Sequence, residues 1–403
     1  MSKVKKPVFL DETGKELVDV LHRQNLLLDV MANTAIESAS TLKEIHNIVR
    51  SGNASKIFNI GDQIIVPWTD KATGKTYQVP LDVVHFGNVD VMYKSGIPAM
   101  FLQWHYCTPF NVQFDAREAF HVAPSGGYAA GSTFTFNVPT AWSSSGSGDF
   151  KFACNNAIPK GAHFVFATDI FSAGLNGATV KVYADGSSDT EIDSFTISNG
   201  STGTYNLGEL KAEGDTSLNA IHTTVYGFNR WGKSALRQFL NSKANPDAWW
   251  TSQHSYDRKP AELATKYGFM SGFEDEFLAT LQPIKVSTAL NTVNEDGSLE
   301  VTYDTFFPPC LQNMNITEQL AGEGDVFEYW LKVSQSSSKL AQGGTYPQLK
   351  TYGIDNTNTA QNVRLRSAAR GNTNHTWIDY SPGNVGTSNA TDSSRCAPVC
   401  AMC

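Results

Sequence analysis

The sequence has little charge, few cysteines and no long apolar run, and each shortage excludes a class of protein. Only 17% of the 403 residues are charged, and 31 Lys and Arg against 39 Asp and Glu leave a net charge of −8. This acidic balance disfavours nucleic-acid binding, which draws on clustered Lys and Arg. No apolar run approaches the roughly 20 residues that cross a bilayer, so we expect no membrane insertion. The N-terminal segment also lacks the apolar stretch of a secretory signal.

Six cysteines are too few for a disulfide scaffold in a chain of this length. Cys396, Cys400 and Cys403 end the chain as RCAPVCAMC. No histidine or second cysteine pair lies nearby in the sequence to complete a tetrahedral zinc shell. The segment therefore predicts a buried, reduced strand, because a free cysteine behaves as a small hydrophobe. We expect no metal ion and no other cofactor.

Catalytic motifs are also missing. The sequence contains no G-x-S-x-G and no H-E-x-x-H, and we expect no phosphate-binding loop. The nine histidines are dispersed, and His105 and His121 lie in aromatic runs that are typical of hydrogen-bonded core histidines. The acidic cluster at 274–276 is typical of a solvated helix face. We therefore expect a protein that is not an enzyme.

The first part of the chain has the periodicity of a helix. Apolar residues over 12–50 recur in alternating steps of four and three, a period of about 3.5 residues that is typical of a coiled-coil seam. We predict a helix there, ended by Gly52. It packs on its own chain or associates with further copies. A second apolar face at Leu26, Leu27 and Val30 favours self-association, with a trimer as the preferred oligomer.

The rest of the chain predicts an α+β multidomain protein. Residues 56–210 have short period-two segments between Gly, Ser and Asn turns, which indicate a β-rich, sandwich-like middle. A composition shift near 211 opens a last domain, 211–403, after the helical segment 1–55. Within it we predict helices near 232–242, 260–268 and 272–282, and strands near 284–290, 298–306 and 326–334. Residues 335–395 lack periodicity and predict a displayed surface held by a scaffold.

The last forty residues or so alternate between two kinds of position. The framework positions are 365–367, Thr373, Trp377, 383–385, Ala390 and 395–398. At the positions between them, every residue is Asn or is reached from the Asn codon AAC by changing only its adenines. These candidate binding residues are Asn372, Asn374, His375, Ile378, Tyr380, Pro382, Gly386, Thr387, Ser388, Asn389, Thr391, Asp392 and Ser393.

This pattern, LRS…RGNTN…W…GNV…NA…RCAPVC, resembles the C-terminal variable region of target proteins of diversity-generating retroelements. In that family, reverse transcription that is error-prone at adenines rewrites the end of the target gene. The segment 231–241 resembles the lectin-like domain that often precedes such a tail, and IVRSGNASKIFNIGDQIIVPW resembles the N-terminal parts of gut-phage members. The resemblance implies a C-type-lectin-like fold, shared with formylglycine-generating enzymes, for residues 211–403.

The resemblance also implies a function. Many members are phage receptor-binding proteins, so we expect an adhesin on the virion surface that binds a host cell-surface protein or glycan. Its N-terminal region would contact virion proteins. Tyr380, His375 and Asn374 would point outward from the variable region 364–403, while Trp377, Leu365 and Val385 support it.

Two other functions stay open. One is a structural virion protein, such as a head fibre or decoration, and the other is a bacterial surface ligand-binding protein. Deletion of 364–403 is expected to leave particles that assemble but do not adsorb if the chain is an adhesin, and to prevent assembly if it is structural.

Overall fold

The computed structural model describes most of the chain after residue 40. The described residues are 41–403 except 118, 120, 139–147, 168–178, 186–189, 197, 200–204, 210–226, 254–258, 261–264, 293–294, 317–319, 332–349 and 382–383. The expectations for residues 1–40, which include most of the predicted helix over 12–50, lie outside this part of the chain. Strands dominate the described residues, and the helices are short. None of these helices is both long and apolar enough to cross a bilayer.

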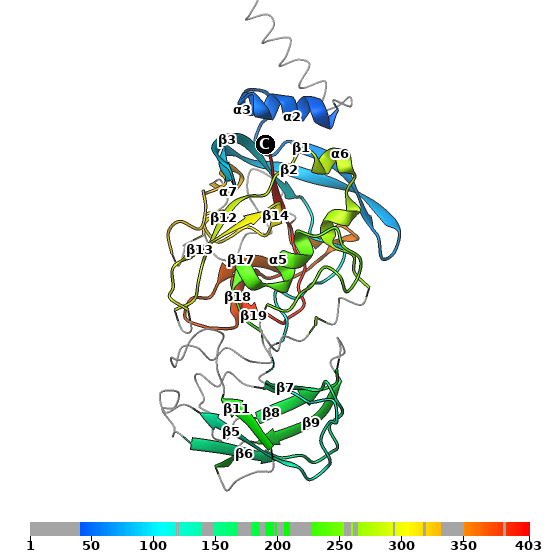
Figure 1. The fold of residues 1–403 in the computed structure, drawn as a ribbon. Helices are drawn as coiled ribbons and strands as arrows, with labels where there is room; N and C mark the ends of the chain where they lie inside the picture. Colours follow the sequence, from blue (N-terminus) through cyan, green and yellow to red (C-terminus); the bar gives the residue numbers. More distant parts are fainter. Residues whose placement is uncertain are drawn as a thin grey trace, which may run out of the picture.

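A seven-stranded sheet forms the centre of the larger body in Figure 1. The strand order is β13-β12-β2-β3-β20-β14, and β1 pairs with β2 outside this path. The strands are β1 (Gln63–Asp70), β2 (Lys75–Val91), β3 (Lys94–Trp104), β12 (Ile284–Ala289), β13 (Leu299–Asp304), β14 (Phe306–Phe307) and β20 (Val399–Met402). Strand β20 lies between β3 and β14, with Cys400 opposite both Leu102 and Phe306. The end of the chain is therefore an interior strand of the main sheet.

This topology differs from the expected division of the chain at 210. Strands β1, β2 and β3 come from the predicted middle domain, yet they share one sheet with strands from the predicted last domain. The antiparallel pair of β3 with β20 joins residues almost 300 positions apart, as Gln103 opposite Val399 illustrates. Local periodicity identifies strands but carries no information on such pairing. The boundary at 210 consequently does not separate two sheets.

The strands form where the sequence alternates, and their inner faces meet in an aromatic core. Along β1, Ile64, Val66 and Trp68 are buried while the residues between them face outward. The Trp68 ring lies 5.6 Å from the Trp104 ring and 5.7 Å from the Phe269 ring, centroid to centroid. Such edge and tilted ring contacts stabilise the packing beyond the area that they bury.

Helix α2 (Leu42–Arg50) is the described end of the predicted N-terminal helix. Thr41 and Glu44 form a reciprocal capping box at its start, which stabilises the first turn of α2. Ile45 and Val49, both in the predicted seam, are buried in the core of their own chain. The chain then turns at Gly52, with φ of 75°, into the short helix α3 (Ala54–Ile57). This end of the seam therefore packs on its own chain and not on a partner helix.

The second body in Figure 1 is a β-rich unit from the middle of the chain. One sheet has the order β4-β7-β8-β9 and the other β10-β6-β5-β11. Their strands are β4 (His121–Val122), β5 (Thr133–Val138), β6 (Gly148–Ala153), β7 (His163–Phe166), β8 (Thr179–Tyr183), β9 (Glu191–Thr196), β10 (Ser198–Asn199) and β11 (Tyr205–Glu209). The rings of Phe134 and Phe164, one from each sheet, lie 5.5 Å apart. The predicted β-rich character of this region is confirmed.

Short helices cover part of the main sheet. They are η4 (Trp231–Lys233), α5 (Ala235–Leu240), η6 (Phe269–Gly272), α6 (Asp275–Leu278) and α7 (Glu328–Leu331). The helix predicted near 232–242 is present, and Arg237 on it pairs with buried Asp304 at 2.7 Å. The described residues 265–268 are not helical, contrary to the prediction for 260–268.

The strand predicted near 326–334 is wrong at its centre, where the chain forms α7. Tyr329 and Trp330 are neighbours in the sequence, and both are buried. A strand would point consecutive side chains to opposite faces, whereas a helical turn places them on adjoining parts of one surface. Two adjacent large rings can therefore both reach the same core only through the helical turn.

Candidate functional site

The predicted variable tail forms a small three-stranded sheet of β17 (Val363–Ala368), β18 (His375–Asp379) and β19 (Val385–Asn389), in that order. It lies at the lower end of the larger body in Figure 1. Every residue of β17 is buried, and β19 is half-exposed along its whole length. Strand β18 alternates between half-exposed and buried residues as far as Ile378, and its last residue, Asp379, is buried as well. Exposure thus increases across the sheet from framework to predicted variable positions. The β18–β19 strands and the turn that follows them, 390–394, make up what we call the tail face.

Arg364 holds the tail face from beneath. Its guanidinium is fully buried and donates to the backbone carbonyls of Asn389 at 3.0 Å and Asp392 at 2.9 Å. It also donates to the carbonyl of Ser388 at 3.3 Å and to the hydroxyl of Thr376 at 2.6 Å. Burial lowers the pKa of Arg364 to about 10, which still leaves the group charged at neutral pH. One buried cation thereby fixes the course of the chain from 388 to 392.

Two side chains from outside the tail also donate hydrogen bonds to backbone carbonyls of the tail. The amide of Asn229 donates to the carbonyls of Asn372 at 2.7 Å and His375 at 2.9 Å. The amide of Gln113 donates to the carbonyl of Thr391 at 2.7 Å. Because these bonds end on backbone oxygens, they do not depend on which side chain the accepting residue carries. The backbone of the tail face can keep its course while its side chains change.

Most of the predicted binding residues are at least half-exposed in the tail sheet and its turns, but not all of them. Half-exposed residues are Asn372, His375, Tyr380, Gly386, Thr387, Ser388 and Asn389, and the exposed ones are Asp392 and Ser393. Pro382 lies outside the described residues. Asn374, Ile378 and Thr391 are buried, with 3%, 1% and 8% of their surface exposed.

Asn374 does not point outward as predicted. Its side-chain amide donates to the side-chain oxygen of Asn389 at 3.0 Å, and its own backbone carbonyl accepts from the amide of Ala390 at 2.7 Å. Ile378 is buried because successive residues of a strand face opposite sides, and the half-exposed Trp377 precedes it. Codon chemistry only predicts which positions vary, and the direction of a side chain is set by strand register.

Some predicted variable side chains stabilise the turns themselves. The side-chain oxygen of Asn372 accepts from the backbone amides of Asn374 at 2.9 Å and His375 at 3.1 Å. The carboxylate of Asp392 accepts from the amide of Asn389 at 3.0 Å and from the hydroxyl of Ser388. Asn and Asp favour such local bonds in turns. Substitution at these two positions therefore removes turn contacts as well as changing the surface.

Tyr380 and Gly386 are coupled across the strand pair. The Tyr380 hydroxyl donates to the carbonyl of Thr387 at 2.6 Å. A Cβ atom placed on Gly386 would lie 2.7 Å from Cε2 of the Tyr380 ring. The ring therefore occupies the space that any larger residue at 386 would need. Both residues belong to the predicted variable set, so one restricts the other.

Asp379 was missed by the sequence reasoning. It ends β18 with 1% of its surface exposed, and neither carboxyl oxygen has a hydrogen-bond partner among the described residues. Burial raises the pKa of Asp379 to about 8. The group is consequently held neutral next to the predicted binding residue Tyr380. Strand alternation would place Asp379 on the same side as half-exposed Trp377, so its burial comes from tertiary packing, which no local pattern reveals.

A buried ionic cluster lies in the main body. The carboxylate of Asp82 bonds Nδ1 of His105 at 2.9 Å and the ammonium of Lys350, and it also accepts from the amide of Gln63 at 2.9 Å. Burial opposes the charge of Asp82, but Lys350 and His105 outweigh it and lower the pKa of this carboxyl. His105 is thus a hydrogen-bonded core histidine, as predicted.

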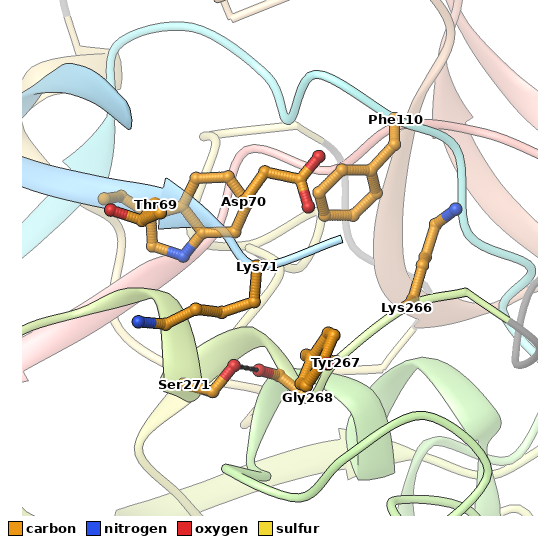
Figure 2. A pocket seen from close by; sticks show the side chains of 9 residues that line it. Thr69, Asp70, Lys71, Phe110, Lys266, Tyr267, Gly268 and Ser271 are labelled. Atoms are coloured by element: carbon orange, nitrogen blue, oxygen red, sulfur yellow. Dashed lines mark hydrogen bonds between the residues drawn. The ribbon is translucent and has the colours of Figure 1, made fainter. Parts of the chain in front are cut away.

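The described residues contain no group of three or more His, Cys, Asp or Glu side chains that is placed to hold a metal ion. All six cysteines are unpaired and buried, and the predicted buried strand at the end of the chain is β20. Figure 2 shows a hollow between the end of β1 and the start of η6, lined in part by Lys71, Phe110 and Tyr267. Its volume of about 10 Å³ has room for a single water molecule.

Among the comparisons with known proteins, one family model matches, over about half of the chain. No curated protein and no solved structure matches it. Residues 209–402 match the model of a family described as a domain of unknown function, DUF6273. The match includes the whole tail sheet and β20, but it leaves out β1, β2 and β3, with which β20 shares the main sheet.

Proposed function

We propose that the chain is a hypervariable receptor-binding protein of a phage virion, which presents the tail face to a protein or glycan on the host surface. The resemblance of the tail to retroelement-diversified proteins motivates this proposal. The observation that carries it is the set of bonds from Arg364, Asn229 and Gln113 to backbone carbonyls of the tail. A diversified binding surface needs such a rigid backbone, with folding energy supplied away from the varying side chains.

The proposal includes the finer architecture. The last domain, completed by β1 to β3, serves as the C-type-lectin-like scaffold, and the N-terminal segment docks the protein on the particle or joins it into a trimer. Since Ile45 and Val49 are buried in their own chain, the association seam lies upstream of α2. Several copies on one particle compensate for weak single-site binding through avidity.

Population sequencing of codons 364–403 tests the proposal most directly. We expect replacements confined to adenine-derived codons, most varied at half-exposed and exposed positions such as His375, Thr387 and Ser393. Ile378 should vary only among apolar residues, because its side chain is buried. Codons that are invariant, or that vary mainly at silent sites, would contradict diversification and leave a fixed structural role.

A binding assay tests the surface itself. His375→Ala and Thr387→Ala in the full chain should weaken adsorption to bacterial cells from the source population, with the melting temperature unchanged. Tyr93→Ala is the matched control, because Tyr93 is 92% exposed on the β2–β3 turn and lies outside the tail sheet. Equal adsorption by all three variants and the wild type would count against the tail face as the receptor site.

Deletion of 364–403 cannot distinguish an adhesin from a structural virion protein. The deletion removes β20, an interior strand of the main sheet, and so would prevent folding in either case. Side-chain replacements on the tail face make the distinction, because they leave β20 in place. Particles that assemble but do not adsorb support the adhesin, whereas particles that fail to assemble support the structural alternative.

A further inference from the structure

A second hollow, of about 320 Å³, lies away from the half-exposed positions of the tail face. It is bounded by the ends of β2 and β12, by β14 and by the segment 323–327, and Phe101, Phe307 and Phe327 line it. Arg366 of the framework strand β17 lines it as well. Ligand sites start at about 300 Å³ and combine apolar walls with a few placed polar groups. The size and the lining both fit a small ligand.

Arg366 is the group that points to a ligand. Only 2% of its surface is exposed, and its guanidinium lies 5.7 Å from the Phe307 ring. Nη2 donates to the backbone carbonyl of Glu323, while Nε and Nη1 have no hydrogen-bond partner among the described residues. A buried cation with unused N–H groups is costly, and a carboxylate offers the acceptors that it lacks.

The acidic residues around the hollow do not supply this partner. The carboxylate of Glu323 accepts from the backbone amide of Ala289 at 2.9 Å and from the hydroxyl of Ser367 at 2.8 Å. Asp90 accepts from the amide of Gly96 at 3.1 Å, and Asp325 is exposed. No described carboxylate forms an ion pair with Arg366. Its charge is therefore left for an anion from outside the chain.

We propose that this hollow binds a small molecule with one carboxylate group and an apolar body. The carboxylate bonds Arg366, and the body lies against Phe101 and Phe327. Nε and Nη1 have almost no exposed surface, so a side chain of the wall shifts when the ligand enters. Simple carboxylic acids and free apolar amino acids share this chemistry. For an amino acid, Asp325 at the hollow is the partner of the ammonium group. The site is independent of the proposed receptor binding.

Calorimetric titration of the full chain with three matched probes tests this. The probes are 3-phenylpropionate, L-phenylalanine and phenethylamine, which carry the carboxylate alone, both groups, and the amine alone. We expect 3-phenylpropionate to bind with a Kd of about 1 mM or tighter, and phenethylamine not to bind. If the natural ligand is an amino acid, L-phenylalanine binds more tightly than 3-phenylpropionate and Asp325→Asn removes the difference; if it is a simple acid, L-phenylalanine binds no more tightly.

Variants identify the group responsible. Arg366→Met should weaken 3-phenylpropionate binding at least about tenfold. Lys285→Met, which removes an exposed cation at the same hollow, should leave the affinity within about twofold. Should Arg366→Met fail to fold, Ser287→Trp serves instead, since it fills the hollow from a half-exposed position. Absence of binding to the folded wild type, or binding that survives both Arg366→Met and Ser287→Trp, would overturn the proposal.

Discussion

At the scale of single residues, the tail depends on a few polar side chains buried beneath its surface. The Arg364 guanidinium donates to the backbone oxygens of residues 388, 389 and 392, so one side chain supplies hydrogen-bond donors to all three carbonyls. A long side chain with five donors suits this role, because Arg can reach several carbonyls at once. The framework therefore stabilises the tail face without restricting the residues displayed on it.

Replacement of Arg364 should accordingly lower the free energy of unfolding far more than replacement of an exposed side chain on the tail face. Arg364→Ala leaves buried carbonyls without donors, and we expect it to lower the free energy of unfolding by about 3 kcal/mol. Thr387→Ala, on the half-exposed strand β19, should change it by less than about 0.5 kcal/mol. Urea denaturation of both variants measures the difference. Equal stabilities would show that the Arg364 bonds contribute nothing to the fold.

Asp379 should make stability depend on pH. Its pKa is about 8 in the folded protein against an ordinary value of 3.8, so the folded state binds the proton more tightly than the unfolded state. Stability is therefore full below pH 3.8 and declines up to about pH 8, by at most about 1.4 kcal/mol per pH unit.

Asp379→Asn mimics the neutral carboxyl and should flatten this profile. At pH 8 the variant should unfold at higher urea concentration than the wild type, and near pH 4 the two should agree. Asp325→Asn, at an exposed aspartate, serves as the control. A wild-type profile that coincides with that of Asp379→Asn between pH 4 and pH 8 would rule out a buried neutral carboxyl.

At the scale of elements, β18 and β19 act as a pair whose side chains are not independent. Ile378 is opposite Gly386, and the Tyr380 ring lies over Gly386. A larger residue at 386 therefore requires a change at 380, or displacement of the Tyr380 ring. This coupling restricts which combinations of residues the tail face can display.

Gly386→Ala in the wild-type background should displace Tyr380 and break its bond to the Thr387 carbonyl. We expect Gly386→Ala to lower the free energy of unfolding by about 1 kcal/mol. In a Tyr380→Ala background the same substitution should cause no further loss, because the ring that it would displace is absent. Urea denaturation of the two single variants and the double variant measures this coupling. Additive losses would mean that the two positions vary independently.

At the scale of the whole molecule, the proposed variable tail and the chain terminus belong to different sheets. The tail sheet is the proposed display surface, whereas β20 completes the main sheet between β3 and β14. Nε2 of His46 on α2 bonds the backbone oxygen of Cys403 at 2.7 Å, which links the first described helix to the last residue. Under the proposed function, diversification would therefore have to stop before the terminal strand.

Truncation after Pro398 should abolish folding, because it leaves β3 and β14 without their common neighbour. We expect insoluble protein or loss of the cooperative transition in circular dichroism. Replacement of Ser393 by Ala, in the exposed turn just before the terminal segment, is the control and should keep the transition. A soluble, cooperatively folding truncation would show that β20 is dispensable.

Local chemistry in the sequence determined several elements correctly. Alternation predicted the strands near 284–290 and 298–306, the helix near 232–242 follows from its 3.6-residue pattern, and the apolar character of the terminal cysteines predicted the buried strand β20. The candidate residues of the tail are largely half-exposed or exposed for the same reason, since turn-forming and small polar residues concentrate at exposed positions. Each of these properties depends on residues only a few positions apart.

The tertiary structure alone decided how these elements combine. It paired β3 with β20, turned Asn374 and Ile378 inward, and formed α7 where a strand was predicted. It also buried Arg364, Arg366 and Asp379. The carboxyl oxygens of Asp379, and Nε and Nη1 of Arg366, have no hydrogen-bond partner among the described residues. Register and burial arise from contacts between distant parts of the chain, and a period-two pattern is the same whichever strand lies beside it.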